Sequence, residues 1–237
     1  TAQIGQANGG GWAGLTAGRR FVNDGTVNMG ASDDPNPPGY YYDWSNYMSM
    51  SQGAQVVNTG TWNLRYARSS SCNGYGGNCA VLNSNYGNEA QPSFVNAGVL
   101  NKTAPIETGI AVPFTNTGTV NLNTGTLHLW GANGGGTIPD SGRYTTAAGT
   151  ILDFAQGGRE LRTGASVTGG ATFRVSGNLT MSVPIGLDKW DVTGSLTVQP
   201  NVTVSTLSFY GSEISGTGDL TVTGSLSWSY GSMSGSG

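Results

Sequence analysis

The stretch Asn116-Thr117-Gly118-Thr119-Val120-Asn121 decides the fold, because its pattern, Asn-x-Gly-x-apolar-Asn, occurs three more times upstream. Self-similarity at a recurring spacing is typical of repeat architectures, in which each copy is one structural unit. The repeated positions, which we predict to be structural, are Asn23, Gly25, Asn28, Asn58, Gly60, Asn63, Asn96, Gly98, Asn101, Asn116, Gly118 and Asn121. A degenerate fifth copy is expected at 123–127, directly after the fourth.

The spacing of the copies predicts the length of one turn. Asn96 and Asn116 lie 20 residues apart, whereas Asn23 and Asn58 are separated by 35 residues and Asn58 and Asn96 by 38. The simplest explanation is a coil of roughly 20 residues with insertions at about 30–55 and 65–92. Insertions in such a coil are expected to form loops on one face.

The second half carries a related phrase without the asparagine. Its copies begin at Val167, Val192, Ile214 and Met233, and each reads apolar-Thr/Ser-Gly. Strands expected at 195–198, 203–209 and 219–223 alternate apolar residues with Ser or Thr, which is typical of half-buried strands. Two or three such strands fit into about 20 residues at ~3.3 Å each. We predict a single all-β domain over 1–237, a parallel β-helix (β-solenoid).

Composition supports an ordered, polar, uncharged protein. The chain of 237 residues has 40 Gly and only 10% charged residues, but its six Trp and ten Tyr argue against disorder. The net charge is −3 without basic runs, so the electrostatic footprint of a nucleic-acid partner is absent. No stretch approaches the ~20 apolar residues of a membrane-spanning helix, and no cofactor motif is visible.

The repeated residues suggest structural roles inside the coil. Equal positions superpose in stacked turns, so the asparagines can form ladders of hydrogen-bonded side chains, as in cross-β stacks. Phe21, Phe94 and Phe114 are expected to stack as an aromatic column in the core by the same argument. Ligand binding by the asparagines is the less favoured alternative.

Cys72 and Cys79 are separated by six glycine-rich residues, which can turn tightly. We expect a small disulfide loop, stabilising by roughly 2–2.5 kcal/mol on the chain-entropy model. Free thiols on the same loop remain the alternative. A disulfide would favour an extracytoplasmic location.

The first insertion concentrates aromatic residues among prolines. These possible contacts to a protein or a glycan are Tyr40, Tyr41, Tyr42, Trp44 and Tyr47. Exposed aromatic side chains serve as interface hot spots or stack on sugars. The alternative is that the loop folds down and its rings cover the solenoid.

Catalysis is not expected, although some β-helices cleave polysaccharides. Glycoside hydrolysis needs two carboxylates about 5–10 Å apart; the candidates are Asp33-Asp34 with Asp43, and Asp188 with Asp191. Neither group has the companion residues of pectin-degrading enzymes or the clustered acids of a calcium site. His128, which alternates with apolar neighbours, is expected on the exposed face of a strand. We predict no metal and no cofactor.

Two further possibilities are weakly supported. Sequons at Asn101, Asn178 and Asn201 leave glycosylation open, but such triplets arise by chance in an Asn- and Thr-rich chain. An ice-binding surface would need a regular threonine array, and the threonine spacing here is uneven.

The phrases beginning at Phe94, Phe114 and Gly216 resemble the repeats of large secreted bacterial surface proteins, the filamentous-haemagglutinin-like and autotransporter-passenger β-helices. The resemblance covers roughly 90–237. It implies a secreted, surface-exposed structural protein with host or matrix glycans as possible partners.

The rung phrase continues to the last residue, without a visible capping segment. Solenoids need polar caps to stay monomeric, because an open rung is an unpaired edge. We therefore expect head-to-tail stacking into a filament. The alternatives are an adhesin stalk fragment and a carbohydrate-binding or carbohydrate-cleaving β-helix.

Overall fold

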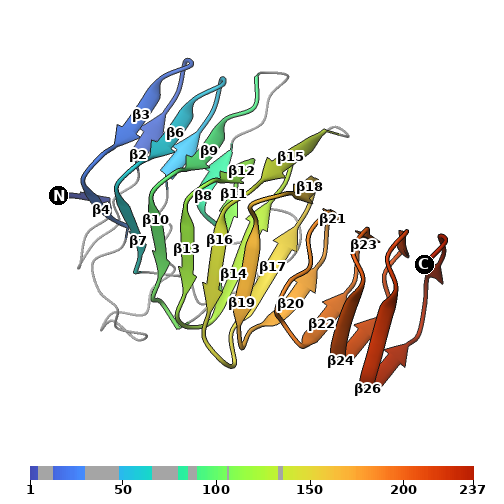
Figure 1. Ribbon diagram of the computed structural model, residues 1–237. Coiled ribbons are helices and arrows are strands. Elements are labelled where there is room, and N and C mark those ends of the chain that lie inside the picture. The colour runs from blue at the N-terminus through green and yellow to red at the C-terminus, as the bar shows by residue number, and fades with distance from the viewer. Residues whose placement is uncertain (5–12, 30–47, 66–79, 85–89, 106, 133–135) are drawn as a thin grey trace.

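The computed structural model describes residues 1–4, 13–29, 48–65, 80–84, 90–105, 107–132 and 136–237. These residues form strands and turns that stack as a β-solenoid of parallel sheets with turns of about 21 residues (Figure 1). The predicted parallel β-helix is thereby confirmed. Within the described part of the chain, no helix could cross a membrane.

Four sheets run along the stack, and one of them extends from the first turn to the last. We call this ten-stranded sheet the axial sheet. Its strands are β2 (Ala13–Leu15), β5 (Met48–Met50), β8 (Ala80–Ser84), β11 (Thr108–Ala111), β14 (Thr126–Trp130), β17 (Ile151–Ala155), β20 (Thr172–Val175), β22 (Lys189–Val192), β24 (Val202–Phe209) and β26 (Leu220–Trp228).

A seven-stranded sheet covers the first two thirds of the stack. It contains β1 (Ala2–Ile4), β4 (Thr26–Met29), β7 (Thr61–Leu64), β10 (Val99–Lys102), β13 (Thr119–Leu122), β16 (Arg143–Thr146) and β19 (Ser166–Gly169).

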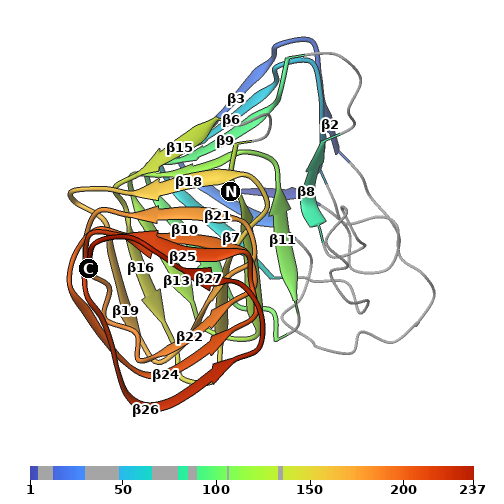
Figure 2. The same ribbon diagram turned by 90° about the vertical axis from the view of Figure 1, so that its right-hand side faces the viewer.

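The third face is divided between two sheets. The four-stranded sheet at the N-terminal end holds β3 (Arg20–Asn23), β6 (Gln55–Asn58), β9 (Ser93–Asn96) and β12 (Phe114–Asn116). The six-stranded sheet that follows holds β15 (Thr137–Asp140), β18 (Gly158–Leu161), β21 (Asn178–Met181), β23 (Ser195–Val198), β25 (Glu213–Gly216) and β27 (Ser232–Met233). Seen along the stack, the four-stranded sheet projects away from the compact outline of the later turns (Figure 2).

Register places the four copies of the repeat on top of one another. Asn23, Asn58, Asn96 and Asn116 are consecutive partners in the four-stranded sheet. The expected fifth copy at 123–127 is not in this register, because Thr119 and Asn121 pair with Arg143 and Thr145 instead. The fifth place belongs to Asp140-Ser141-Gly142, which precedes Arg143 as Asn116-Thr117-Gly118 precedes Thr119.

The repeated phrase of the second half is not one structural position. Val167 lies in the seven-stranded sheet, Val192 in the axial sheet, and Ile214 and Met233 in the six-stranded sheet. Only the last two are register partners. A short apolar-hydroxyl-glycine phrase occurs wherever a strand meets a corner, so it does not identify the face.

Each expected insertion contains one strand of the axial sheet, β5 within 30–55 and β8 within 65–92. Cys72 and Cys79, and the aromatic group from Tyr40 to Tyr47, lie outside the described residues.

Glycine in the repeat permits the close approach of successive turns. A Cβ at Gly98 would lie 2.2 Å from the backbone oxygen of Gly60, and one at Gly118 would lie 2.2 Å from the oxygen of Gly98. Gly25, in the first copy, has no atom within 4 Å of such a Cβ. Stacking, not turn conformation, therefore requires glycine in the second to fourth copies.

The core column of aromatic rings differs from the expected one in one member. Phe94 and Phe114 are in contact with ring centroids 5.4 Å apart, but Phe21 reaches them through Trp62, which lies 6.1 Å from Phe21 and 5.2 Å from Phe94. Val56 holds the register position between Phe21 and Phe94. Trp62 from the seven-stranded sheet supplies the ring that this turn lacks.

Candidate functional site

The first asparagine of each repeat forms an inner ladder. Asn23, Asn58 and Asn96 each donate an Nδ2 hydrogen bond to the Oδ1 of the next asparagine, at 2.7, 2.7 and 2.9 Å. The same amide groups donate to backbone oxygens of the next turn, such as Val99 O from Asn58 at 3.0 Å. All four asparagines are buried. The predicted ladder is present, and its members have partners along the stack.

The second asparagine of each repeat forms an outer ladder that runs the other way. Asn63, Asn101 and Asn121 donate back to Asn28, Asn63 and Asn101 at 2.8, 2.8 and 2.9 Å. These side chains are half-buried on the outer face of the seven-stranded sheet. The sequon residue Asn101 is therefore engaged in the ladder, whereas Asn178 and Asn201 are exposed.

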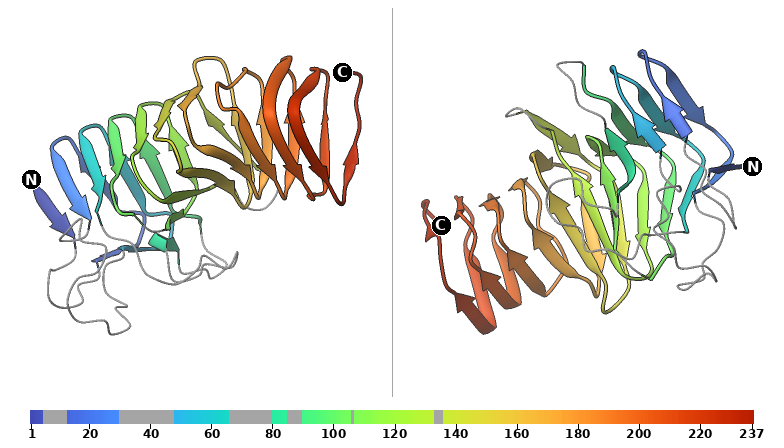
Figure 3. Two further views of the ribbon diagram at one scale, coloured as in Figure 1. Left: turned by 90° about the horizontal axis from the view of Figure 1, so that it is seen from below. Right: turned by 180° about the vertical axis from the view of Figure 1, so that it is seen from behind.

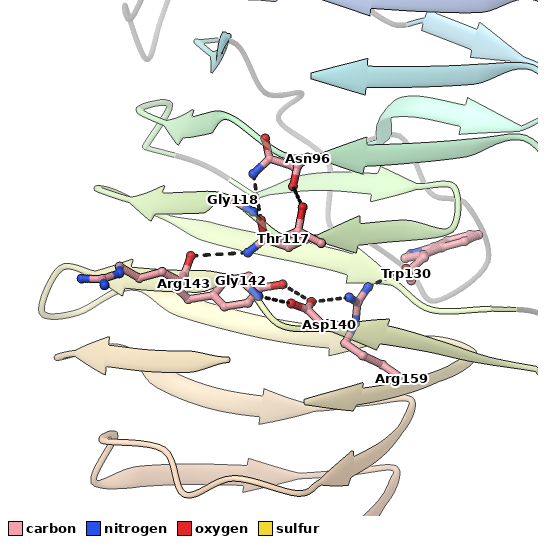
Figure 4. Close-up of polar contacts among 10 residues, drawn as sticks. Asn96, Thr117, Gly118, Trp130, Asp140, Gly142, Arg143 and Arg159 are labelled. Atoms are coloured by element: carbon pink, nitrogen blue, oxygen red, sulfur yellow. Dashed lines mark hydrogen bonds and ion pairs between the residues drawn. The ribbon is translucent and has the colours of Figure 1, made fainter. Parts of the chain in front are cut away.

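The inner ladder ends at a buried charged cluster, which we call the junction cluster: Asp140, Tyr144 and Arg159. Arg159 Nη1 donates to Asp140 Oδ2 at 2.7 Å, and its Nη2 donates to the Trp130 backbone oxygen at 2.9 Å (Figure 4). The Tyr144 hydroxyl donates to the same Asp140 oxygen. The guanidinium also faces the rings of Phe114 and Phe154 at 5.8 and 5.3 Å from their centroids.

Burial controls the ionisation of the junction cluster. It raises the pKa of Asp140 above its usual value, against the opposing attraction of Arg159 and the hydrogen bonds from Tyr144 and Gly142. It also raises the pKa of Tyr144 well above the usual value, and the Asp140 carboxylate adds to that rise. The contacts of the cluster join β15 and β18 to β16. They lie where the third face passes from the four-stranded to the six-stranded sheet, and they hold these strands together.

The residues of the junction cluster were not predicted from the sequence, although a signal was present. Asp140-Ser141-Gly142 repeats the Asn-x-Gly form with Asp in place of Asn, and Gly142 N donates to Asp140 Oδ1 at 3.2 Å as Gly118 N does to Asn116 Oδ1. A search that allowed Asp for Asn would have found it. Arg159 has no such signal, because it holds a core position between Ile138 and Leu179.

Lys102 is a second buried charge that the sequence did not reveal. It is the register partner of Leu64 and Leu122, at a core position of the seven-stranded sheet. Its Nζ donates to the backbone oxygens of Ala104 and Thr124, the latter at 3.3 Å. Burial lowers the pKa of Lys102 from 10.5 to about 7.

His128 is buried, which corrects the expectation of an exposed residue; only 8% of its surface is accessible. Its Nδ1 lies 2.7 Å from Asp153 Oδ2, and because a carboxylate only accepts, Nδ1 carries the hydrogen. Ser176 donates to both oxygens of Asp153, at 2.8 and 2.9 Å. Nε2 has no hydrogen-bond partner within the described residues and lies 4.0 Å from Glu107 Oε2.

This group on the axial sheet resembles part of a hydrolytic triad in composition but not in geometry. In a triad the serine hydroxyl faces the histidine nitrogen that the carboxylate leaves free. Here the Ser176 hydroxyl donates to the Asp153 carboxylate instead of facing His128 Nε2. The contacts orient the imidazole and tie β14 to β17.

Of the carboxylates considered for hydrolysis, Asp33, Asp34 and Asp43 lie outside the described residues. The other two, Asp188 and Asp191, make different contacts. Asp191 accepts a hydrogen bond from Arg174 Nε at 2.8 Å, across neighbouring strands of the axial sheet. Asp188 is exposed, and its backbone oxygen accepts from Ser205 and Thr206. Trp190 between them points inward and is buried. In the described part of the chain, no three His, Cys, Asp or Glu side chains form a metal-binding group.

The two termini lie at opposite ends of the stack (Figure 3). At the C-terminal end, large apolar side chains are exposed on the last strands. We call the surface of β26 and β27 the end rung. Leu226 and Trp228 are 51% and 50% exposed, although their register partners Leu207 and Phe209 are buried in the core. The centroid of the Trp228 ring lies 6.0 Å from that of Phe209. One side of the Trp228 ring therefore packs on the buried Phe209, and the other side is exposed.

In comparisons with known proteins, no protein-family model, curated protein or solved structure gives a significant match to the chain.

Proposed function

We propose that this chain is a structural, non-enzymatic, extracellular protein whose solenoid stacks end to end into a surface or matrix filament. The observation that supports this function is the half-exposed Trp228 on the end rung, in register with the buried Phe209. A large ring that continues a core column is stabilised when a further layer covers it.

The edge strand supports the same proposal. β26 is nine residues long, and residues 220–237 contain no charged residue and no proline. Natural edge strands are usually protected by lysine, proline, bulges or short length. β26 is long and has neither lysine nor proline, although its pairing with β24 contains one register shift, between Val204 and Thr206. Its free backbone groups can pair with another strand, which a stacked copy would supply.

The extracellular assignment rests on the repeat phrases, which resemble those of filamentous-haemagglutinin-like and autotransporter-passenger proteins. The fold is compatible with that class, and the low content of charged residues is too. Adhesion to host or matrix glycans would be a property of the assembled rod.

Negative-stain electron microscopy of the purified chain tests the proposal. Wild type is expected to form long uniform filaments. Trp228→Lys is expected to abolish them, because the ammonium would be buried at the junction between copies. Ser227→Lys is the matched control. Side chains alternate along a strand, so the side chain at 227 points to the outer face of the sheet, and filaments should persist. Circular dichroism must show β structure in both variants.

A chain that remains monomeric at high concentration would overturn the proposal. Isolated rods of that kind would favour the adhesin stalk or the carbohydrate-binding alternative. A glycan array with the chain, and with its Tyr40–Tyr47 segment replaced by Gly and Ser, would then separate those two.

A further inference from the structure

The outer face of the seven-stranded sheet carries two columns of uncharged residues. In each of the strands β4, β7, β10 and β13, the second residue is buried in the core, so the first and third residues face outward. The first column is Thr26, Thr61, Val99 and Thr119, and the second is Asn28, Asn63, Asn101 and Asn121. All eight side chains are half-buried. We call these two columns the outer array.

The fold makes the outer array regular although its residues are unevenly spaced along the chain. From β4 to β13 the strands pair without a register shift, so both columns repeat at the strand spacing of about 4.8 Å. The long segments between the copies follow β4 and β7 and therefore add no residue to either column. The even spacing removes the objection that the sequence raised against a regular threonine array.

The side chains of the outer array are held in place before any ligand arrives. Each asparagine after Asn28 donates one Nδ2 hydrogen bond to the asparagine of the preceding turn, at 2.8, 2.8 and 2.9 Å. Side-chain ladders of this kind keep sheets flat against their usual twist. An amide has two donors and two acceptor sites, so the ladder leaves one of each for a ligand. In the described part of the chain, the hydroxyl groups of Thr26, Thr61 and Thr119 have no hydrogen-bond partner.

We infer that the outer array binds the surface of ice. Ice presents water molecules at fixed spacings, each able to donate and accept hydrogen bonds, and the repeat within its layers is close to the spacing of β-strands. A rigid array of hydroxyl, amide and methyl groups can match that lattice without losing side-chain entropy on binding. Ice binding by this face does not depend on the proposed filament, because the array lies along the side of the stack (Figure 1).

The chemistry of the outer array favours ice over other ligands. Sugars stack on exposed aromatic rings, and neither column contains one. A second copy of the chain would need apolar area to bury, but Val99 is the one apolar member of the array. A nucleic acid would need a basic surface, whereas all eight residues are uncharged and the first column meets a charge only at Arg143 of β16.

Partition of the fluorescently labelled chain into a growing ice crystal tests ice binding. Wild type should be enriched in the ice. Thr61→Arg, in the middle of the array, should lower this enrichment about tenfold, because its guanidinium would lose water against the lattice without gaining a partner. Thr180→Arg is the matched control on the outer face of β21, beside Glu160, and should partition as wild type does. Circular dichroism must show the same β structure in all three proteins.

Completion of the first column tests the same face in the opposite direction. Val99→Thr adds a hydroxyl at the position that lacks one, and its β-branched shape suits the strand equally well. The variant should show a larger thermal hysteresis, the interval between the melting and freezing temperatures of a small ice crystal, than wild type at equal concentration. A wild-type chain with neither enrichment nor thermal hysteresis overturns ice binding, and so does equal enrichment of wild type and Thr61→Arg.

Discussion

Asn58 shows how a single polar residue can belong to the core of this protein. Its side chain is fully buried, accepts from Asn23, and donates to Asn96 and to the Val99 backbone oxygen. A buried amide is tolerated when its donors and acceptors are all used. The ladder supplies such partners only because identical residues superpose in successive turns.

Replacement of this residue should be costly. Asn58→Ala is expected to lower the free energy of unfolding by about 2–4 kcal/mol, because buried groups of its neighbours lose their partners. Asn63→Ala, in the half-buried outer ladder, should cost about 1 kcal/mol or less, since water can replace the bonds. Urea unfolding monitored by circular dichroism measures both values. Equal losses would contradict the distinction between the two ladders.

Lys102 makes the stability of the protein depend on pH. Its pKa in the folded state is about 7, below the ordinary 10.5, so between these values the unfolded chain binds a proton that the folded chain releases. Stability contributed by this residue is therefore full above pH 10.5, is lost as the pH falls toward 7, and is constant below.

Lys102→Leu, which restores the residue type of the register partners Leu64 and Leu122, should remove that dependence. The slope of unfolding free energy against pH, about 1.4 kcal/mol per pH unit at most for one proton, should be smaller in the variant between pH 7 and 10. Thermal unfolding at a series of pH values compares the two proteins. Parallel curves would show that Lys102 does not titrate in this range.

At the scale of elements, the junction cluster marks where the four-stranded sheet gives way to the six-stranded sheet. β12 is the last strand of the first and β15 begins the second. The inner ladder stops there because Asp140 replaces asparagine, and the carboxylate turns its hydrogen bonds to Arg159 and Tyr144. A change of residue type thus coincides with a change of sheet.

Breaking this cluster on one side should be worse than removing it. Asp140→Asn leaves the buried guanidinium of Arg159 without its counter-ion, with an expected cost of about 3–5 kcal/mol. The double variant Asp140→Asn/Arg159→Leu should recover much of that loss, because it removes the buried charge. Guanidinium unfolding of the single and double variants measures the coupling. A double variant less stable than Asp140→Asn would show that the arginine stabilises by packing alone.

At the scale of the whole molecule, the stack behaves as a one-dimensional array in which each turn contacts its neighbours. The column of buried side chains and the parallel backbone pairing link each turn to the next. The end rung shares this chemistry, since residues 220–237 carry no charge.

Assembly should accordingly be insensitive to ionic strength. Raising sodium chloride from 0.05 to 0.5 M is expected to change the critical concentration less than twofold, because screening acts on charges and residues 220–237 contain no charged residue. Ammonium sulfate should lower it, since excluded salts strengthen apolar burial. Sedimentation of filaments at each salt concentration provides the measurement. A tenfold rise of the critical concentration in sodium chloride would point to electrostatic contacts between copies at another surface.

The sequence by itself determined the parallel β-helix, the length of its turns and the stacking of Asn23, Asn58, Asn96 and Asn116. These features depend on short-range patterns repeated along the chain: alternation sets the strands, and superposition of equal positions sets the ladders. The glycines could be predicted for the same reason, because a side chain at Gly98 would collide with the turn before it.

Only the tertiary structure decided which face each later strand joins, that Trp62 completes the aromatic column, and that Lys102, His128 and Arg159 are buried. Burial of a charged residue depends on partners brought from other turns, as Asp140 is brought to Arg159, and no local pattern encodes them. The exposure of the end rung is also decided only by the tertiary structure. Its sequence resembles any other rung, and what distinguishes Trp228 is that no neighbouring turn of the described chain covers it.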